Sequence, residues 1–369
     1  MVRSPSTRPS RPARSQIGQA GPAVRDFRAS TASYRIEWDV RTVYDFVFSL
    51  SDDAGSTEDM PAADRRWLTA VRAALPEPAK ADRASLLADE VCIQVAETIV
   101  ELPDVRTPAA FVAALGAMDP RTALRTIASD LFRDSATAAL ADRAIDGDAE
   151  AIELVIAATP EYHRAGTTEI LRDPLGIVGR LLGVLDAWQK PFAEIEPRLL
   201  AMLERDVEAR AEDARTLAPG DLIERTTGGL RYLPEPGVRR VILAPSYFAR
   251  PYNFLFSKDD WRLYGYPIAD SALDSGDPLE PPPAVIRLHR ALGDPSRLRV
   301  LRLLADGDRY LTEIAQALEL SKPTVKHHMA QLRAAGLVTL TEEGSLTYYS
   351  LRRDRIDEVG ADLRRFISS

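Results

Sequence analysis

The sequence predicts an α+β protein that is mainly α with small β elements, and three observations support this fold class. From Pro61 to about Leu217, apolar residues recur with a period near 3.6, as they do on the buried faces of amphipathic helices. Residues 221–268 instead carry short alternating runs separated by Gly and Pro, which is typical of strands. After a proline-rich stretch at 270–283, residues 284–369 combine short helical patterns with one pair of alternating runs. We therefore expect a helical N-terminal body with a short sheet, followed by a smaller C-terminal unit.

The composition is that of an ordinary globular protein, with 45% hydrophobic and 28% charged residues. A length of 369 residues exceeds what one hydrophobic core usually holds, which favours more than one domain. The single cysteine, Cys92, cannot form an internal disulfide or a thiolate metal site. The longest apolar stretch, 175–188, is interrupted by Arg180, and residues 1–30 lack the apolar core of a secretory signal. We expect a cytoplasmic protein without a membrane segment.

Charge is distributed unevenly along the chain, and this changes what the net charge of −8 implies. Taken alone, an acidic total argues against binding to nucleic acid. Residues 1–30, however, hold six Arg and one acidic residue, and residues 283–369 hold fourteen bases and eleven acids. The 27 bases and 43 acids of the intervening segment give it a net charge of −16. An anionic partner is therefore expected at the C-terminal unit and not at the body.

Residues 1–30 are predicted to be a disordered basic tail, because Arg, Pro, Ser and Gly offer almost nothing to bury. The tail could help to hold DNA, although a solvated tail or a misplaced start codon is the simpler interpretation. Residues 31–269 are expected to form the body, with an effector-binding or dimerisation role. Residues 270–283 have neither periodicity nor much apolar content, which indicates a linker.

Several helices joined by short loops are expected in the body. Residues 82–102 carry an apolar stripe at helix spacing. Further helices are predicted at 108–117, 120–132, 136–145, 149–158 and 174–188. Pro191 and Pro197 are predicted to interrupt the helical pattern before another helix at about 198–217, because proline lacks the N–H that an interior helix position requires.

Two stretches of the body suggest β-structure. The run YRIEWDVRTVYDFVFSL, at 34–50, alternates apolar and polar residues and is compatible with either a strand or a helix. Within 221–268, the runs GGLRYL, VRRVILA and WRLYGYPI are predicted strands.

The unit after the linker has a dense pattern of helix-start signals. A first helix in PAVIRLHRALGD is followed by Asp294, which can cap a second helix that begins at Pro295. Thr312 is predicted to cap a third helix, and Ser321 a fourth that Gly336 ends. Each cap supplies a side-chain oxygen for backbone N–H groups that would otherwise lack a partner.

The third and fourth helices, joined at Glu319-Leu320, have the pattern of a helix-turn-helix. Along the fourth helix, apolar residues fall on one arc, while small polar and basic residues project from the other sides. The runs that follow, VTLTEEGSLTYYSL, predict a hairpin about Glu343-Gly344-Ser345, and a final helix is predicted at about 354–367. Glutamates at the hairpin tip would repel phosphates, so the tip is expected to contribute little to DNA contact.

The segment ALGDPSRLRVLRLLADGDRYLTEIAQALELSKPTVKHHMAQLRAAGLV, followed by LTYYSL, resembles the ArsR/SmtB family of bacterial winged-helix transcription regulators. The resemblance covers roughly residues 285–367. It implies a winged helix-turn-helix at 284–369 and a sequence-specific DNA-binding regulator of the bacterial nucleoid, by default a repressor. It also implies a homodimer that forms through the first and last helices of the unit and binds an inverted repeat of double-stranded DNA.

The fourth helix would enter the major groove with its N-terminal half leading. The candidate DNA-binding residues are Ser321, Lys322, Thr324, Lys326, His327, Gln331, Arg352 and Arg353. The hydroxyl groups in this set can bond to phosphates or base edges, and the lysines supply charge for phosphates or guanine acceptors. His327 and Gln331 can reach base edges, whereas His328 is expected to adjoin the core.

Metal sensing is not expected. Metal-sensing members of the family carry a Cys pair on the third helix, whereas residues 308–313 contain no thiol. The final helix offers carboxylates but no His, and the adjacent His327 and His328 point about 100° apart on a helix, which does not suit one metal ion.

A small-molecule effector, if there is one, is expected to act through the body. The candidate effector-binding residues are Tyr247, Arg250, Tyr252, Trp261 and Tyr264. Aromatic residues line many ligand pockets, but they also dominate cores and interfaces, and we weigh burial in a core or an interface ahead of a pocket.

An enzyme is the alternative from another class. Glu161-Tyr162-His163 and the acidic helices could include a catalytic group, yet the sequence has no phosphate-binding loop and no nucleophile elbow. We expect no catalytic residues and no cofactor. A body that serves only as a protein-interaction platform fused to the DNA-binding unit remains a further alternative.

Overall fold

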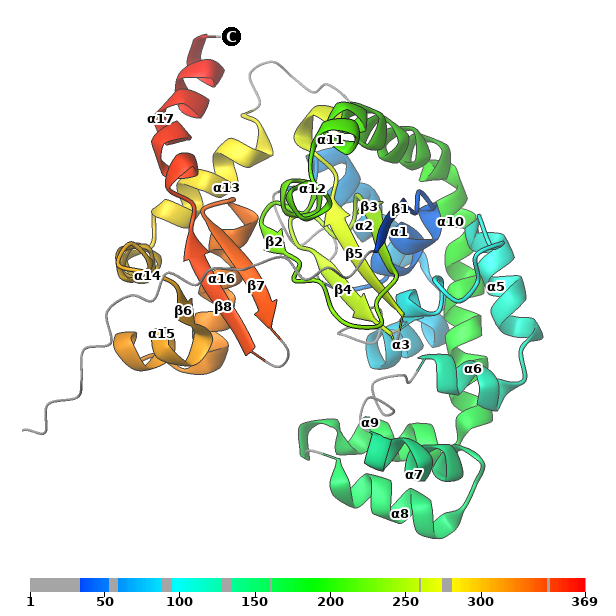
Figure 1. Ribbon diagram of the computed structural model, residues 1–369. Helices are drawn as coiled ribbons and strands as arrows, with labels where there is room; N and C mark the ends of the chain where they lie inside the picture. Colours follow the sequence, from blue (N-terminus) through cyan, green and yellow to red (C-terminus); the bar gives the residue numbers. More distant parts are fainter. Residues whose placement is uncertain are drawn as a thin grey trace, which may run out of the picture.

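The computed structural model describes residues 34–52, 59–87, 95–127, 135–159, 161–258, 260–273, 281–343 and 346–368. The predicted basic tail, Cys92 and residues 274–280 of the predicted linker lie outside these residues. The described chain forms a large body and a smaller C-terminal lobe beside it (Figure 1). Its many helices and small sheets confirm the predicted α+β class.

A four-stranded sheet lies at the centre of the body, with strand order β1-β3-β5-β4. Its strands are β1 (Arg35–Trp38), β3 (Arg240–Ser246), β5 (Trp261–Pro267) and β4 (Phe254–Ser257). β1, β3 and β5 run parallel, and β4 pairs antiparallel with β5. The central strand β3 (RVILAPS) is almost continuously apolar and is buried along nearly its whole length, as expected for a strand covered on both faces. The run at 34–50, which the sequence left open, forms both a strand and a helix.

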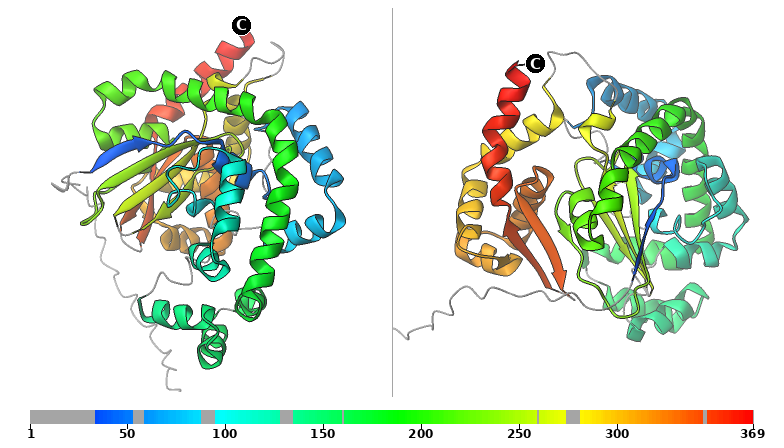
Figure 2. Two further views of the ribbon diagram at one scale, coloured as in Figure 1. Left: turned by 90° about the vertical axis from the view of Figure 1, so that its right-hand side faces the viewer. Right: turned by 45° about the horizontal axis from the view of Figure 1, so that its top comes forward.

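Helices lie around this sheet, most of them on the side away from the C-terminal lobe, although the last helix before β2 lies at the boundary with that lobe (Figure 1 and Figure 2). They are α1 (Thr42–Phe48), α2 (Ala62–Ala74), α3 (Glu77–Leu86), α5 (Pro108–Ala117), α6 (Pro120–Ile127), α7 (Ser135–Ile145), α8 (Ala149–Ala158), α9 (Glu161–Arg172), α10 (Pro174–Ala209), α11 (Ala211–Thr216) and α12 (Pro219–Thr226), followed after β5 by the short 3₁₀ turn η2 (Asp270–Ala272). Every residue of α1 is buried, because this helix lies between the sheet and α10. Parts of the helices predicted at 82–102 and 120–132 fall on residues 88–94 and 128–134, outside the described residues.

The prediction that Pro191 and Pro197 interrupt the helical pattern was wrong. Both lie inside α10, a continuous helix of 36 residues that spans about 54 Å. An interior proline costs about 3 kcal/mol, because it removes one hydrogen bond and crowds the preceding turn. The two prolines are flanked by fully buried side chains, among them Trp188, Phe192 and Leu199, and burial of this face on the body core offsets the local cost.

The C-terminal lobe has its own hydrophobic core and the element order of a winged helix-turn-helix. Its elements are α13 (Pro283–Leu292), α14 (Pro295–Leu304), β6 (Arg309–Tyr310), α15 (Leu311–Leu318), α16 (Lys322–Ala334), β7 (Val338–Glu343), β8 (Leu346–Leu351) and α17 (Arg353–Ser368). The predicted hairpin is confirmed, since β7 and β8 pair antiparallel; residues 344 and 345 at its tip lie outside the described residues. We call this lobe the winged unit.

One strand of the winged sheet comes from the body. The sheet has the order β2-β7-β8-β6, and β2 (Leu230–Arg231) follows α12 in the body. β2 pairs parallel with the edge strand β7, so that Leu230 lies opposite Leu340. Figure 1 shows β2 beside β7 at the boundary between the two lobes. The edge of the winged sheet is thereby covered by the protein's own body.

Among the described residues, no helix is both long enough and apolar enough to cross a lipid bilayer.

Candidate nucleic-acid interface

The helix-turn-helix is built by caps that the sequence signals. Asp294 Oδ1 accepts a hydrogen bond of 2.9 Å from the N–H of Arg297, which confirms the predicted cap of α14. α15 begins at Leu311, and Glu313 accepts a bond of 2.9 Å from the N–H of Tyr310. The predicted cap Thr312 therefore lies inside the first turn of α15, and that prediction was wrong by two positions. Glu313, three residues after the observed cap, instead accepts from the N–H of the cap residue itself.

The turn between α15 and α16 depends on two local conformations. Glu319 adopts a left-handed conformation with φ of 56°, which ends α15. Ser321 then caps α16, because its Oγ accepts a bond of 3.2 Å from the N–H of Thr324 and lies 2.7 Å from the Thr324 hydroxyl. At the other end, Gly336 has φ of 71° and ends the helix as predicted.

The apolar arc of α16 packs into the winged unit. Val325, Met329 and Leu332 are buried in its core. Of the predicted DNA-binding residues, the five in the N-terminal half are exposed on the other sides of this helix: Ser321, Lys322, Thr324, Lys326 and His327. The helix therefore brings these five together on one solvent-accessible end, where hydroxyl, ammonium and imidazole groups alternate.

Gln331 is not part of this exposed group. It is half-buried, and its Nε2 donates a bond of 2.8 Å to the hydroxyl of Tyr252 in the body. Two residues further on, Arg333 Nη1 donates a bond of 3.1 Å to Asn253 Oδ1. Both partners follow the turn after β3, so the C-terminal half of α16 contacts the body.

The two arginines predicted after the hairpin lie at the start of α17. Arg353 is exposed and donates a bond of 2.5 Å to the carbonyl of Ala305. Arg352 is partly buried and lies 3.3 Å from Asp354. His328 is half-buried beside the winged core, as expected, and its Nδ1 is a buried atom without a hydrogen-bond partner among the described residues. That part of the chain also holds no group of three or more His, Cys, Asp or Glu able to bind a metal ion.

The predicted effector-binding residues do not gather in one place. Tyr247 and Trp261 are buried in the core of the body, whereas Tyr264 belongs to a second cluster around Tyr232 and Tyr266. Burial and the neighbouring Asp64 raise the pKa of Tyr247, whose hydroxyl donates to that carboxylate. Tyr252 lies apart from both clusters, bonded to the winged unit.

Arg250 occupies a charged cluster that sequence reasoning missed. Its guanidinium donates to the carbonyl of Ile268 and to Asp270. Asp270 also lies 3.7 Å from Arg287 of α13, which forms a further ion pair with Asp59. Burial opposes ionisation of Asp270, yet the two arginines hold the pKa of its carboxyl below the usual range. These charges join the body to the first helix of the winged unit, and no local pattern signals partners so far apart in the chain.

The fold and the exposed basic end of α16 define a winged helix-turn-helix DNA-binding protein. Residues 294–339 match the family model described as bacterial regulatory protein, arsR family. An uncharacterized HTH-type transcriptional regulator of Methanocaldococcus jannaschii is 37% identical over 73 residues, which cover 20% of this chain and 82% of the relative. The arsenical resistance operon repressor of Staphylococcus xylosus is 34% identical over 74 residues, covering 20% of this chain and 71% of the relative. The regulator CmtR of Mycobacterium bovis is 44% identical over 68 residues, which cover 18% of this chain and 58% of CmtR.

Through its winged unit the chain belongs to the arsR family of bacterial regulatory proteins, a family of DNA-binding transcription regulators. A crystal structure of an ArsR family transcriptional regulator, 23% identical, covers 22% of this chain and 90% of its own with a TM-score of 0.21. The family model ends at residue 339 and begins at 294, so the body lies outside it.

Proposed function

We propose that this protein is a sequence-specific transcription repressor that binds an inverted repeat of double-stranded DNA as a homodimer. In this proposal a small non-metal effector, bound by the body at 31–269, releases the protein from its operator. The observation that supports DNA binding best is the N-terminal half of α16, where Lys322, Thr324, Lys326 and His327 are all exposed at one end of a capped helix. We propose that the protein acts on the nucleoid of the bacterial cytoplasm.

The chemistry of this end suits a major groove. Lysine ammonium groups neutralise phosphates or donate to guanine acceptors, and the threonine hydroxyl and the histidine ring can reach base edges. The N-terminus of α16 adds partial positive charge, which favours a nearby phosphate. Arg353, exposed at the start of α17, is proposed to add a backbone contact beside the hairpin.

The test is binding to the DNA upstream of the protein's own gene across a salt series. Log K should fall linearly with log salt, and Lys326→Ala should reduce the slope by about 1, because one phosphate contact is lost. The matched control is Lys190→Ala, which removes an exposed lysine of α10 in the body and should leave the slope unchanged. Equal affinity of the wild type and of every α16 variant for this duplex and for a random duplex would refute sequence-specific binding.

The proposed homodimer is supported by the surface of α17. None of its 16 residues is buried, yet it carries an apolar stripe at helix spacing through Ile356, Val359, Leu363 and Ile367. Ile356 is 36% and Ile367 71% exposed, which is unusual for isoleucine on a structured helix. A second copy of the same helix would cover this stripe in a self-complementary contact.

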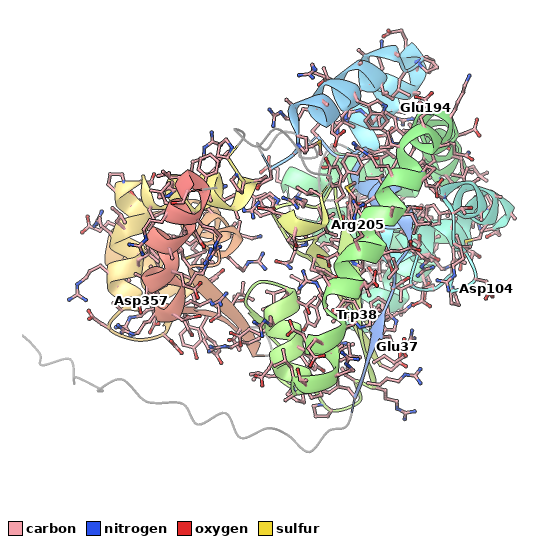
Figure 3. All side chains as sticks on the ribbon, turned by 90° about the horizontal axis from the view of Figure 1, so that it is seen from above. Glu37, Trp38, Asp104, Glu194, Arg205 and Asp357 are labelled. Carbon is pink, nitrogen blue, oxygen red and sulfur yellow. The ribbon has the colours of Figure 1, made fainter. Side chains whose placement is uncertain are left out.

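A charge placed in the stripe tests the dimer. Leu363→Arg should convert a dimer into a monomer, because an unpaired charge cannot be buried in an apolar interface without a large cost. Asp357→Ala, on another side of α17, is the control. Figure 3 shows Asp357 on the winged unit, whereas Glu194 and Arg205 lie on the body. Sedimentation equilibrium measures the result, and an unchanged mass for Leu363→Arg would contradict the proposed interface.

For the body we propose a sensing role, with Tyr247, Arg250, Tyr252, Trp261 and Tyr264 as the residues whose substitution would alter the response to an effector. The test is a metabolite screen for release of bound DNA. A ligand that binds the body should change DNA affinity by a coupling of about 1–3 kcal/mol.

A further inference from the structure

The body covers the outward face of α16 at its C-terminal end. Gln331 and Arg333, which bond to Tyr252 and Asn253, lie on two flanks of the helix. At 100° per residue, Gln331 and Arg333 are separated by an arc of about 160° around the α16 axis, measured on the side away from the buried face. Ala330 and Ala334 lie within this arc. The adjacent residues Tyr252 and Asn253 therefore sit across the side of α16 that points away from the winged core.

The outward-facing side chains of α16 become less exposed toward the C-terminal half of the helix, which contacts the body. Lys326 and His327, in the N-terminal half, are exposed. Ala330, Gln331 and Ala334 are half-buried, although all three point away from the apolar arc. For Gln331 the covering group is identified, because its amide bonds to Tyr252 of the body.

A second contact joins the body to the edge of the winged sheet. Gly229 accepts a hydrogen bond of 2.8 Å from the N–H of Leu340, next to the β2–β7 pairing. Gly229 has φ of 118°, and a Cβ there would lie 3.1 Å from the carbonyl oxygen of Val338, so the close approach requires glycine. Asn253 Nδ2 donates a bond of 3.0 Å to the carbonyl of Thr227 and so links the two contacts. We call residues 227–231 and 252–253, with their partners on α16 and β7, the docking seam.

The docking seam and a bound operator compete for the same side of α16. A recognition helix enters the major groove with the face opposite its own core, and a groove about 12 Å wide admits a helix but not a helix with a further segment across it. The body also belongs to the segment with a net charge of −16, which would repel the phosphates beside the groove. With the seam closed, only the first turns of α16 are accessible.

We propose that the docked arrangement is an autoinhibited state and that the docking seam must separate before α16 can insert fully into DNA. This inference rests on the proposed function of α16 in DNA binding. It assigns Tyr252 and Asn253 as the residues that hold the recognition helix closed, and it makes Gln331 available to bases only in the open state.

The seam combines side-chain and main-chain contacts. Its polar part includes two side-chain hydrogen bonds to α16, the bond from Leu340 to Gly229 and a two-residue strand pairing. On β7, the hydroxyls of Thr339 and Thr341 are buried and lack a hydrogen-bond partner among the described residues. Buried hydroxyls without partners oppose closure, because water would satisfy them if opening exposed β7.

The winged unit would stay attached to the body during opening. Arg287 of α13 is paired with Asp59, and the N–H of Ala284 donates a bond of 2.7 Å to Asp270 Oδ2. These contacts lie at the start of α13, apart from the seam, and can act as the pivot.

The connection between β3 and β4 links the body core to the seam. Tyr247, at its start, bonds through its hydroxyl to Asp64, and Arg250 bonds to Asp270. Tyr252 and Asn253 end the same connection at α16. A ligand that displaces this connection would act directly on the contacts that hold α16.

The first experiment loosens the seam in the full-length protein. Tyr252→Phe and Asn253→Ala each remove one hydrogen bond to α16, and each should tighten binding to the upstream duplex about five-fold, or about 25-fold together, while the docked state predominates. Gln189→Ala, which removes an amide bonded to Asp186 on α10, is the matched control and should leave affinity unchanged. Hydrogen exchange at the Leu340 amide should become faster when the duplex is added, because its bond to Gly229 is lost.

The second experiment locks the seam. Arg231 and Thr341 are Cα partners in the β2–β7 ladder, so Arg231→Cys with Thr341→Cys can form a disulfide across it. Cys92 is replaced by Ser in every protein compared. The oxidised form should bind the duplex at least about ten-fold more weakly than the reduced form, because the disulfide prevents the protein from reaching the open state that binds DNA.

The outcomes separate this inference from the proposed function. Tighter binding by the loosened variants and weaker binding by the oxidised variant support autoinhibition. Specific binding that neither loosening nor locking changes, or that loosening weakens, would overturn it and leave the DNA-binding role intact. Equal binding of the loosened variants to the upstream and random duplexes would instead refute the proposed function.

Discussion

Asp45, a residue of α1 whose carboxylate contacts the start of the β3–β4 connection, provides a stringent test of how burial and hydrogen bonding balance in the body. The carboxylate is completely buried. Its Oδ1 accepts bonds of 2.6 Å from the Ser246 hydroxyl, 2.9 Å from the N–H of Tyr247 and 2.8 Å from the N–H of Phe248. Burial disfavours the ionised form and raises the pKa of Asp45 to about 6, although all three donors act in the opposite direction.

The sign of the pH dependence follows from this shift. Because the native pKa lies above the unfolded value of 3.8, the native state binds the proton more tightly. The resulting stabilisation is complete below pH 3.8 and is lost as pH rises through about 6. A shift of about two units is worth about 3 kcal/mol in total, of which about 2 kcal/mol falls between about pH 4.5 and 7.5.

The perturbation is Asp45→Asn, which keeps an oxygen acceptor and removes the titration. Urea unfolding at a series of pH values should show the wild type losing about 2 kcal/mol of unfolding free energy relative to Asp45→Asn between about pH 4.5 and 7.5. Asp357→Asn, at an exposed carboxylate, corrects for the change in net charge. A difference that is constant with pH would show that the three donors balance burial, and one that grows in favour of the wild type as pH rises would show that they outweigh it.

Two further stability predictions concern α10 and the winged unit. Trp188 is fully buried, and its Nε1 donates a bond of 2.8 Å to Ser49 Oγ. Trp188→Ala should therefore lower the free energy of unfolding, measured with urea, by about 3–5 kcal/mol. A loss below about 1 kcal/mol would mean that the core beside α10 is loosely packed. Gly336→Ala should lower the free energy of unfolding by about 1–2 kcal/mol in the same assay, because φ of 71° is strained for alanine. A clash does not contribute, since the atom nearest to the added Cβ, Arg355 Nε, is 3.8 Å away. Gly183→Ala, in the interior of α10 with open space around it, is the control and should stabilise by about 0.5–1 kcal/mol.

Local signals predicted the winged unit well. Asp294 and Ser321 cap their helices and Gly336 ends α16, because a cap depends on a few neighbouring backbone groups. The hairpin of β7 and β8 also follows from alternation about a short turn. The cap of α15 was misplaced by two positions, because the helix begins at Leu311 and Glu313 accepts from the N–H of Tyr310.

Proline rules failed where tertiary packing was strong. Pro191 and Pro197 predicted a break, yet α10 continues because Trp188, Phe192 and Leu199 are buried on the core of the body. Propensity describes what an isolated segment prefers, and burial of several large side chains outweighs a preference of a few kcal/mol.

By itself, the sequence determined the family, the helix-turn-helix and the basic, exposed N-terminal half of α16, because each of these depends on residues close together in the chain. Only the tertiary structure decided that Gln331 bonds to Tyr252, 79 positions away, and that β2 of the body completes the winged sheet. These contacts depend on how two lobes pack, which neither helix periodicity nor capping encodes. The physical reason is that a helix pattern specifies which side is apolar, whereas the occupant of its polar side depends on the rest of the fold.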